Sequence, residues 1–165
     1  MQGMAYTINM ENQTVVADAT LIILRTAAAI TTRASVVEIQ RITVSQQGTS
    51  TSQQLGVILG QKASAFGTYT STTPSPMRPG GSASGIAGGT TGAAATAGTD
   101  ASAEGAGAVT ATIVEGFNNL SGYLWVPTPE ERIVLTPDIA FIVKLRGTPT
   151  TLTGWNASLT FAELN

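Results

Sequence analysis

The sequence predicts an all-β protein, folded as an antiparallel two-sheet sandwich of the jelly-roll type. Residues 139–146 alternate large apolar side chains with smaller or charged ones, which is the period-2 pattern of a strand with one strongly buried face. Similar short runs recur, roughly eight to ten in all, and turns rich in Gly, Pro, Ser and Thr separate them. Because no long helical pattern alternates with these runs, antiparallel pairing is expected, and a jelly roll is favoured over a barrel.

The strongest strand signals lie late in the chain. Three apolar runs, 123–126, 133–135 and 139–145, are separated by prolines. Pro127 and Pro129 lack the backbone N–H that a sheet ladder needs, so the first run is expected to end there. We expect these runs to form much of the sheet core.

The beginning of the chain is less regular. Residues 1–13 are expected to form an extended arm or a first edge strand. Residues 15–24 predict a buried strand pair or one long bent strand. Residues 26–34 fit a short helix by their alanines, and fit a loop or a continued strand about equally by their threonines.

One predicted strand changes parity along its length. Val37 and Ile39 share one face, whereas Ile42 and Val44 share the other. One extra residue near positions 40–41 would return all four side chains to the core, which is what a β-bulge does. The sequence therefore predicts a bulged strand.

A long insertion interrupts the pattern at residues 76–107, within a single expected domain of residues 1–165. The range is rich in Gly, Ala, Ser and Thr, and Ile86 is the only large apolar residue between 80 and 107. Such a segment cannot by itself bury enough area to offset the entropy lost on ordering its backbone. It is therefore expected to be a loop, either flexible or ordered by packing against a neighbouring chain.

The alternating runs also identify which side chains should be inside. The predicted core residues are Leu21, Ile23, Val37, Ile39, Val57, Ile113, Ile139, Phe141, Val143, Trp155, Leu159 and Phe161. The residues predicted to lie at an interface with other chains are Tyr6, Ile86, Trp125 and Pro127.

Composition narrows the function classes. The chain has 165 residues, a formal charge of −2 and only 11% charged residues, so we expect no nucleic-acid partner. It has no cysteine and no histidine, which excludes disulfides, thiolate chemistry, Ser-His-Asp triads and the usual zinc ligand sets. It shows neither a signal-peptide pattern nor a membrane span. A sparsely charged surface rich in Thr, Ser, Gln and Asn suits contact with other protein.

The remaining candidates for chemistry are weak. Glu130 and Glu131 are adjacent, and neighbours on a strand point to opposite faces, so a charged turn is the better interpretation. Asp100 and Glu104 lack the spacing of a calcium loop. The glycines of the insertion lack the Gly-Lys-Ser/Thr and strand–turn–helix context of a phosphate site. We expect no enzyme activity, no cofactor, no metal and no small-molecule ligand.

The two tryptophans admit two interpretations. Trp125 and Trp155 would stack on sugar rings if they were exposed, as aromatic side chains do in carbohydrate-binding jelly rolls. Core or interface packing is favoured, because large aromatic residues on alternating strands are usually buried.

Three segments carry a resemblance to a known family: AYTINMENQTVVADATLIILRT (5–26), SGYLWVPTPEERIVL (121–135) and TLTGWNASLTFAEL (151–164). They resemble small virion proteins of tailed bacteriophages, of the head decoration or cement type. The resemblance covers most of the chain and contains no catalytic motif.

The resemblance implies a jelly-roll protomer, commonly trimeric, that is made in the host cytoplasm and sits on the capsid exterior. There it would clamp neighbouring major capsid subunits and stabilise the shell. Two alternatives stay open. One is a carbohydrate- or receptor-binding jelly roll of a phage tail or capsid, and the other is a hydrolase that uses carboxylates alone.

Overall fold

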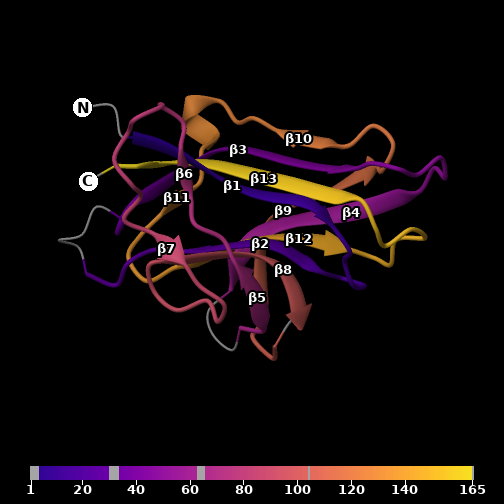
Figure 1. Ribbon diagram of the computed structural model, residues 1–165, viewed down its shortest axis with the longest axis horizontal. Helices are drawn as coiled ribbons and strands as arrows, with labels where there is room; N and C mark the ends of the chain where they lie inside the picture. The colour runs from indigo at the N-terminus through magenta and orange to yellow at the C-terminus, as the bar shows by residue number, and fades with distance from the viewer. Residues whose placement is uncertain (1–3, 30–33, 63–65, 104, 165) are drawn as a thin grey trace.

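The computed structural model describes residues 4–29, 34–62, 66–103 and 105–164. The chain is 54% strand and 2% helix, and its two sheets pack face to face as a sandwich (Figure 1). Within these ranges the helical part is one 3-10 turn, η1 (Pro129–Glu131). The predicted all-β sandwich is therefore confirmed.

The first sheet has six strands. Its path runs β10–β3–β13–β1–β6, and β11 pairs with β3 beside that path. The bounds are β1 (Met4–Gln13), β3 (Val37–Gln46), β6 (Ser75–Pro76), β10 (Tyr123–Trp125), β11 (Val134–Leu135) and β13 (Trp155–Glu163).

The second sheet has seven strands. Its path runs β5–β8–β2–β12–β4–β9, and the short β7 pairs with β8 in parallel. The bounds are β2 (Thr20–Arg25), β4 (Gln54–Lys62), β5 (Thr68–Ser71), β7 (Ala87–Gly88), β8 (Thr96–Ala103), β9 (Val109–Asn118) and β12 (Ala140–Arg146).

The connectivity is that of a jelly roll. Eight strands, β1 to β4 followed by β9, β10, β12 and β13, divide between the sheets. Counted in that sequence, they lie in the order 1-8-3-6 in one sheet and 2-7-4-5 in the other. This arrangement is two interlocked Greek keys. Strands β5 to β8 are an insertion between β4 and β9; β5, β7 and β8 extend the second sheet beyond β2, and β6 pairs with β1 in the first sheet.

The core lies between the two sheets. Trp155, Phe141 and Phe161 are among its largest fully buried side chains. Ten of the predicted core residues are buried; the other two, Ile113 and Ile139, are partly buried and pack against the core.

Strand β12 is buried on both faces, whereas its sequence pattern indicates one strongly buried face. Ala140 and Ile142 point away from the main core and join Ile23, Tyr69 and Ala101 in a second, smaller cluster. Phe66 packs against this cluster. The outer face of β12 is buried because the insertion returns over it, which the alternation within one strand does not reveal.

The bulge predicted in the strand 37–46 is confirmed. Thr160 pairs with Arg41 while the next residue, Phe161, pairs with Ile39, so Gln40 is the extra residue. Ile39 and Ile42 are both fully buried. The bulge thus keeps both halves of β3 facing the core.

The insertion differs from the expected loop. Its eight-residue strand β8 pairs with β2, in a register that includes Ile22 opposite Thr99, and pairs also with β5. A Cβ added at Gly98 would lie 2.9 Å from the carbonyl oxygen of Gly89. The neighbouring backbone is therefore too close to leave room for a side chain at position 98. The segment is ordered by ladder hydrogen bonds to its own chain, which small residues allow.

The beginning of the chain resolves the open alternatives in part. Residues 4–13 form β1, and β6 pairs with it only at Tyr6 and Thr7. Residues 20–25 form one strand, β2, and not a pair. Residues 26–29 and 34 are not helical, and residues 30–33 lie outside the described part of the chain.

Candidate interaction surface

Three of the four residues predicted for an interface belong to the interior. Tyr6 is fully buried, and its ring lies 5.7 Å from that of Phe161 because it occupies the inward face of β1. Ile86 is fully buried in the main core, and Pro127 is buried as well. Trp125 is partly buried against the core. The predictions for Tyr6, Ile86 and Pro127 were wrong, because β1, the insertion and the segment after β10 bury these side chains within this chain itself.

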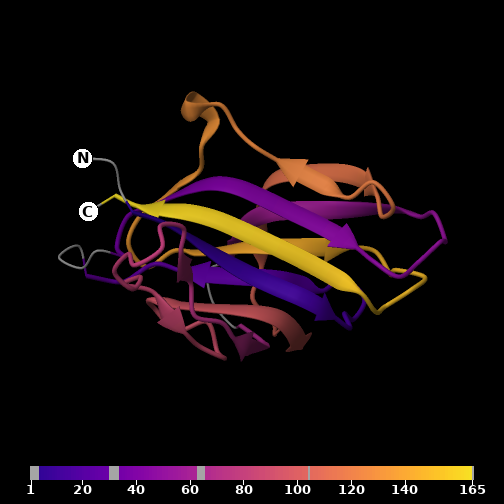
Figure 2. The ribbon, with the colours of Figure 1, turned by 45° about the horizontal axis from the view of Figure 1, so that its top comes forward.

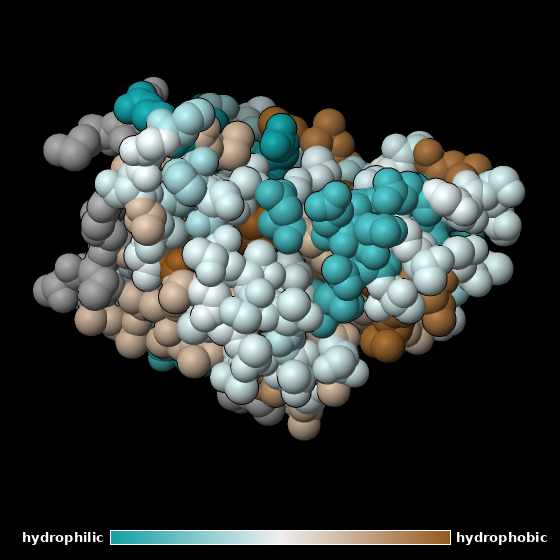
Figure 3. Space-filling view, in the orientation of Figure 1, coloured by the Kyte–Doolittle hydropathy of each residue, from teal (hydrophilic) through white to brown (hydrophobic). Residues whose placement is uncertain are grey.

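The exposed apolar side chains gather instead where β9 ends one sheet and β10 and β11 end the other. Among the described residues, five of the nine large exposed hydrophobic residues lie in this region: Val114, Leu120, Leu124, Val126 and Val134. Figure 2 shows η1 and β10 standing out from the top of the sandwich. In Figure 3 separate patches of hydrophobic surface lie at the upper margin and at the lower right, whereas most of the hydrophilic side chains gather right of the centre of the face.

The first part of this region is the β10–β11 patch, formed by Leu124, Val126 and Val134. Leu124 is 65% exposed and Val126 is 62% exposed. Tyr123 points inward, so strand alternation turns Leu124 to the outer face of the first sheet. Leu135 is buried, which turns its neighbour Val134 outward in the same way. Sequence reasoning missed this patch, although the alternation about Leu124 was a signal for it.

The second part is the β9 edge, residues Val109–Asn118. In the described part of the chain, β9 pairs with β4 alone, and most of its residues are exposed. Gly56 pairs with Gly116, and neither has a side chain. Both glycines line a shallow depression of about 480 Å³ on the outer face of the second sheet. Arg146 and Glu115 are among the residues that line it.

Electrostatics near this edge are simple. Glu115 is the only charged residue of β9. Burial, assisted by the neighbouring Glu115 carboxylate, raises the pKa of the Tyr123 phenol. Tyr123 therefore remains neutral at physiological pH, and β9 carries one negative charge.

Among the described carboxylates, only Glu163 is buried, and it has a structural role. Its Oε1 accepts hydrogen bonds from Ser84 Oγ at 2.6 Å and from the Gly85 N–H at 2.8 Å. Ser84 Oγ also accepts one from the Ile86 N–H at 3.0 Å. These bonds fasten the insertion to the last strand, β13.

The other carboxylates do not form a site. No group of three potential metal-ligating side chains occurs among the residues that the structure describes. Glu130 and Glu131 are exposed in η1. Asp100 lies on β8, where burial raises the pKa of its carboxyl, and Glu104 lies outside the described residues.

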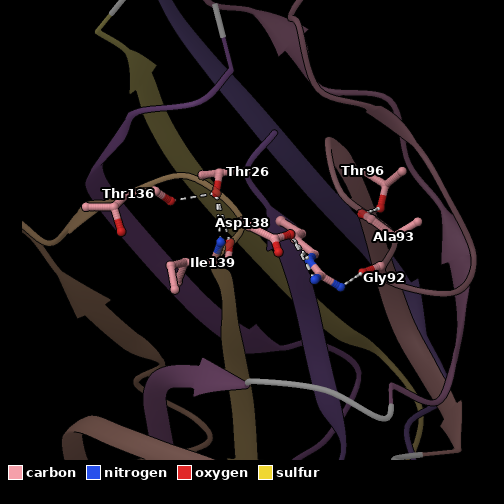
Figure 4. A network of polar contacts seen from close by, with 8 residues as sticks. Thr26, Gly92, Ala93, Thr96, Thr136, Asp138 and Ile139 are labelled. Atoms are coloured by element: carbon pink, nitrogen blue, oxygen red, sulfur yellow. Dashed lines mark hydrogen bonds and ion pairs between the residues drawn. The ribbon is translucent and has the colours of Figure 1, made fainter. Parts of the chain in front are cut away.

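A polar network ties the end of β2 to the start of β12 (Figure 4). Arg25 pairs with Asp138 at 2.9 Å and donates to the Gly92 carbonyl at 3.1 Å. Thr26 Oγ1 donates to the Thr136 carbonyl at 2.7 Å and accepts from the Ile139 N–H at 3.0 Å. The network provides hydrogen-bond partners for backbone groups between the strands, so we assign it a role in stability.

The aromatic residues bear on the carbohydrate-binding alternative. Trp155 is fully buried, and its Nε1–H donates to the Thr151 carbonyl at 3.1 Å. None of the Trp, Tyr and Phe residues, all of which are described, falls in the exposed class. The exposed ring that stacking on a sugar requires is not present.

Comparison with known proteins adds no assignment. No family model, no curated protein and no solved structure matches this chain. Within the described ranges, none of the helical structure is long and apolar enough to cross a membrane.

Proposed function

We propose that this chain is a structural virion protein that decorates the exterior of a tailed-phage capsid. The β10–β11 patch would contact neighbouring major capsid subunits, and the added contact would stabilise the shell. The observation that carries the proposal is the projection of Leu124, Val126 and Val134 from one sheet margin. Exposed aliphatic residues grouped in this way favour a protein partner.

The aliphatic side chains of the patch suit a contact that does not depend on charge. Two ion pairs are found among the described residues, and one of them, Arg132 with Glu38 at 2.9 Å, lies next to β11. Because Arg132 is already paired, its charge is compensated at this surface. An interface core that is apolar and depleted in charge has the usual composition of a specific protein contact.

The resemblance to phage head proteins supports the same proposal. Its three segments correspond to β1 with β2, to β10 through β11, and to β13. They include strands of both sheets, and they include all three residues of the β10–β11 patch. The resembling segments therefore include part of each sheet together with the proposed contact.

The proposal is tested by attachment to particles assembled without this protein. Purified chain should bind such particles and sediment with them. Leu124→Glu places a charge at the most exposed residue of the patch, and we expect it to raise the dissociation constant at least about tenfold, an effect of about 1.4 kcal/mol. Leu152→Glu, at an exposed leucine outside the patch, is the matched control and should bind as the unsubstituted chain does.

Two outcomes would contradict the proposal. Equal binding of Leu124→Glu and Leu152→Glu would show that the patch is not the contact. Particles that are equally robust without the protein but fail to adsorb to host cells would favour the receptor-binding alternative.

A further inference from the structure

The edges of the two sheets are protected very unequally. Among the described strands, β5, β6, β10 and β11 border the sheets with two to four residues each. Pro76 ends β6, and Pro127 follows β10. Short strands and prolines are the devices by which proteins prevent unwanted pairing at sheet edges. These four short strands therefore offer few backbone groups to a further strand.

Strand β9 lacks most of this protection. It has ten residues, VTATIVEGFN, with no lysine and no proline, and Val, Ile and Thr favour extended structure. Its one irregularity is a register shift between Ile113 and Ala111, which leaves Thr112 as an extra residue. A long edge strand with unpaired N–H and C=O groups is a template for another strand.

We propose that β9 pairs antiparallel with β9 of a second copy of this chain, about a twofold axis. The occupant is a second copy because two identical β9 strands satisfy each other. Head-to-tail pairing would need a second long regular edge; among the described strands the nearest to one is β1 beyond Thr7, and its pairing is irregular between Met10 and Gln13. The pairing joins two seven-stranded sheets into one continuous sheet and is isologous.

The sequence of β9 permits this pairing in a specific register. With Val114 on the axis, the two exposed valines face each other and form an apolar cross-strand pair. Glu115 then lies opposite Ile113, so the two carboxylates do not face each other directly. Thr112, the bulged residue, lies opposite Gly116, which has no side chain to clash with it.

The available area is sufficient for a stable contact. In this register nine residues, 110–118, face one another and extend for about 30 Å, and two sheets about 10 Å apart with their side chains give an edge roughly 20 Å thick. The edge thus offers roughly 600 Å² per copy. The total of roughly 1,200 Å² lies at the lower end of the range of specific interfaces, ~1,200–2,000 Å².

This inference does not rest on the proposed function. The β10–β11 patch is on the outer face of the first sheet, so pairing through β9 leaves Leu124 available to a capsid. The state inferred is a dimer, in place of the trimer that the family resemblance implies. Dimerisation is measured on the purified chain and capsid attachment on particles, so either can fail alone.

The experiment uses sedimentation equilibrium on the full chain at micromolar concentrations. We expect a dimer for the unsubstituted protein and at least about a tenfold larger dissociation constant for Val114→Lys. Val16→Lys, at an exposed valine outside β9, should leave the dimer unchanged. Matched far-UV spectra and melting temperatures will show that both variants are folded.

A cross-linking experiment tests the register without depending on affinity. Because the chain has no cysteine, Val114→Cys introduces a single thiol. Facing residues have Cβ atoms about 4.5–5.5 Å apart, close to the separation that a disulfide spans. We expect oxidation to give a covalent dimer for Val114→Cys and none for Val16→Cys. A monomer at ~100 μM, a trimer, or a dimer that Val114→Lys does not weaken would overturn the proposal.

Discussion

At the scale of single residues, Phe141 is expected to contribute strongly to stability. It is fully buried on β12, in the core between the sheets. Phe141→Ala would leave a cavity among aliphatic neighbours, so we expect the free energy of unfolding to fall by about 3–5 kcal/mol. Urea denaturation measures this change. A loss below about 1 kcal/mol would place Phe141 at a rim and contradict its assignment to the core.

A second prediction concerns Tyr123 and the stability of the protein in alkaline solution. Burial, with Glu115 beside it, raises the pKa of this phenol above the usual value of 10.0. Below pH 10 the phenol is neutral in both states, so its contribution to stability does not vary with pH. Above pH 10 the unfolded chain releases the proton that the folded chain retains, and the free energy of unfolding falls as pH rises.

The measurement compares the unsubstituted chain with Tyr123→Phe by urea denaturation at several pH values above 10. The variant should lose stability less steeply with rising pH, since it lacks this phenol. Equal slopes for the two proteins would show that Tyr123 is not perturbed by folding.

At the scale of elements, the Glu163 carboxylate fastens the insertion to β13. Glu163→Ala removes the acceptor for Ser84 Oγ and for the Gly85 N–H, and leaves both donors without it. We expect a loss of about 1–3 kcal/mol and faster amide hydrogen exchange at Gly85. Ser84→Ala is the control, because it retains the Gly85 bond and should leave that amide protected. Unchanged exchange at Gly85 in Glu163→Ala would rule out this role.

Which elements the sequence predicts depends on where their partners lie. The bulge at Gln40 was predictable, because the parity of four aliphatic residues in one strand changes around it. Strand β8 was not, because its small residues show no alternation and become buried only between β2 and β5. The outer face of β12 was missed for the same reason. The periodicity of a strand indicates which of its faces is apolar, and it does not indicate which other segment covers the opposite face.

The candidate surface shows the same limit. Tyr6 was predicted at an interface, within a segment expected to be an extended arm or a first edge strand, yet the structure puts it inside, against Phe161. Leu124 was predictable in principle, since it alternates with the inward Tyr123. The openness of β9 follows from the order of strands in the sheet, which residue patterns alone do not specify.

For the whole molecule, the low charge of the chain predicts how attachment responds to salt. The β10–β11 patch is aliphatic, and exposed charge is sparse across the chain at 11% charged residues. Salt screens interactions between exposed charges and hardly affects apolar contact. Binding to particles should therefore change by less than about threefold between ~50 and ~200 mM salt. A loss of tenfold or more would indicate a contact dominated by charge.

For the whole molecule we propose a structural role on the outside of a capsid. Electron cryo-microscopy of the intact phage particle that carries the chain tests it most directly. We expect density for the two-sheet sandwich on the outer surface of the head, with the β10–β11 patch against neighbouring capsid subunits. Density for the sandwich at the tail tip instead, or a sandwich on the head whose β10–β11 patch faces solvent, would contradict the account.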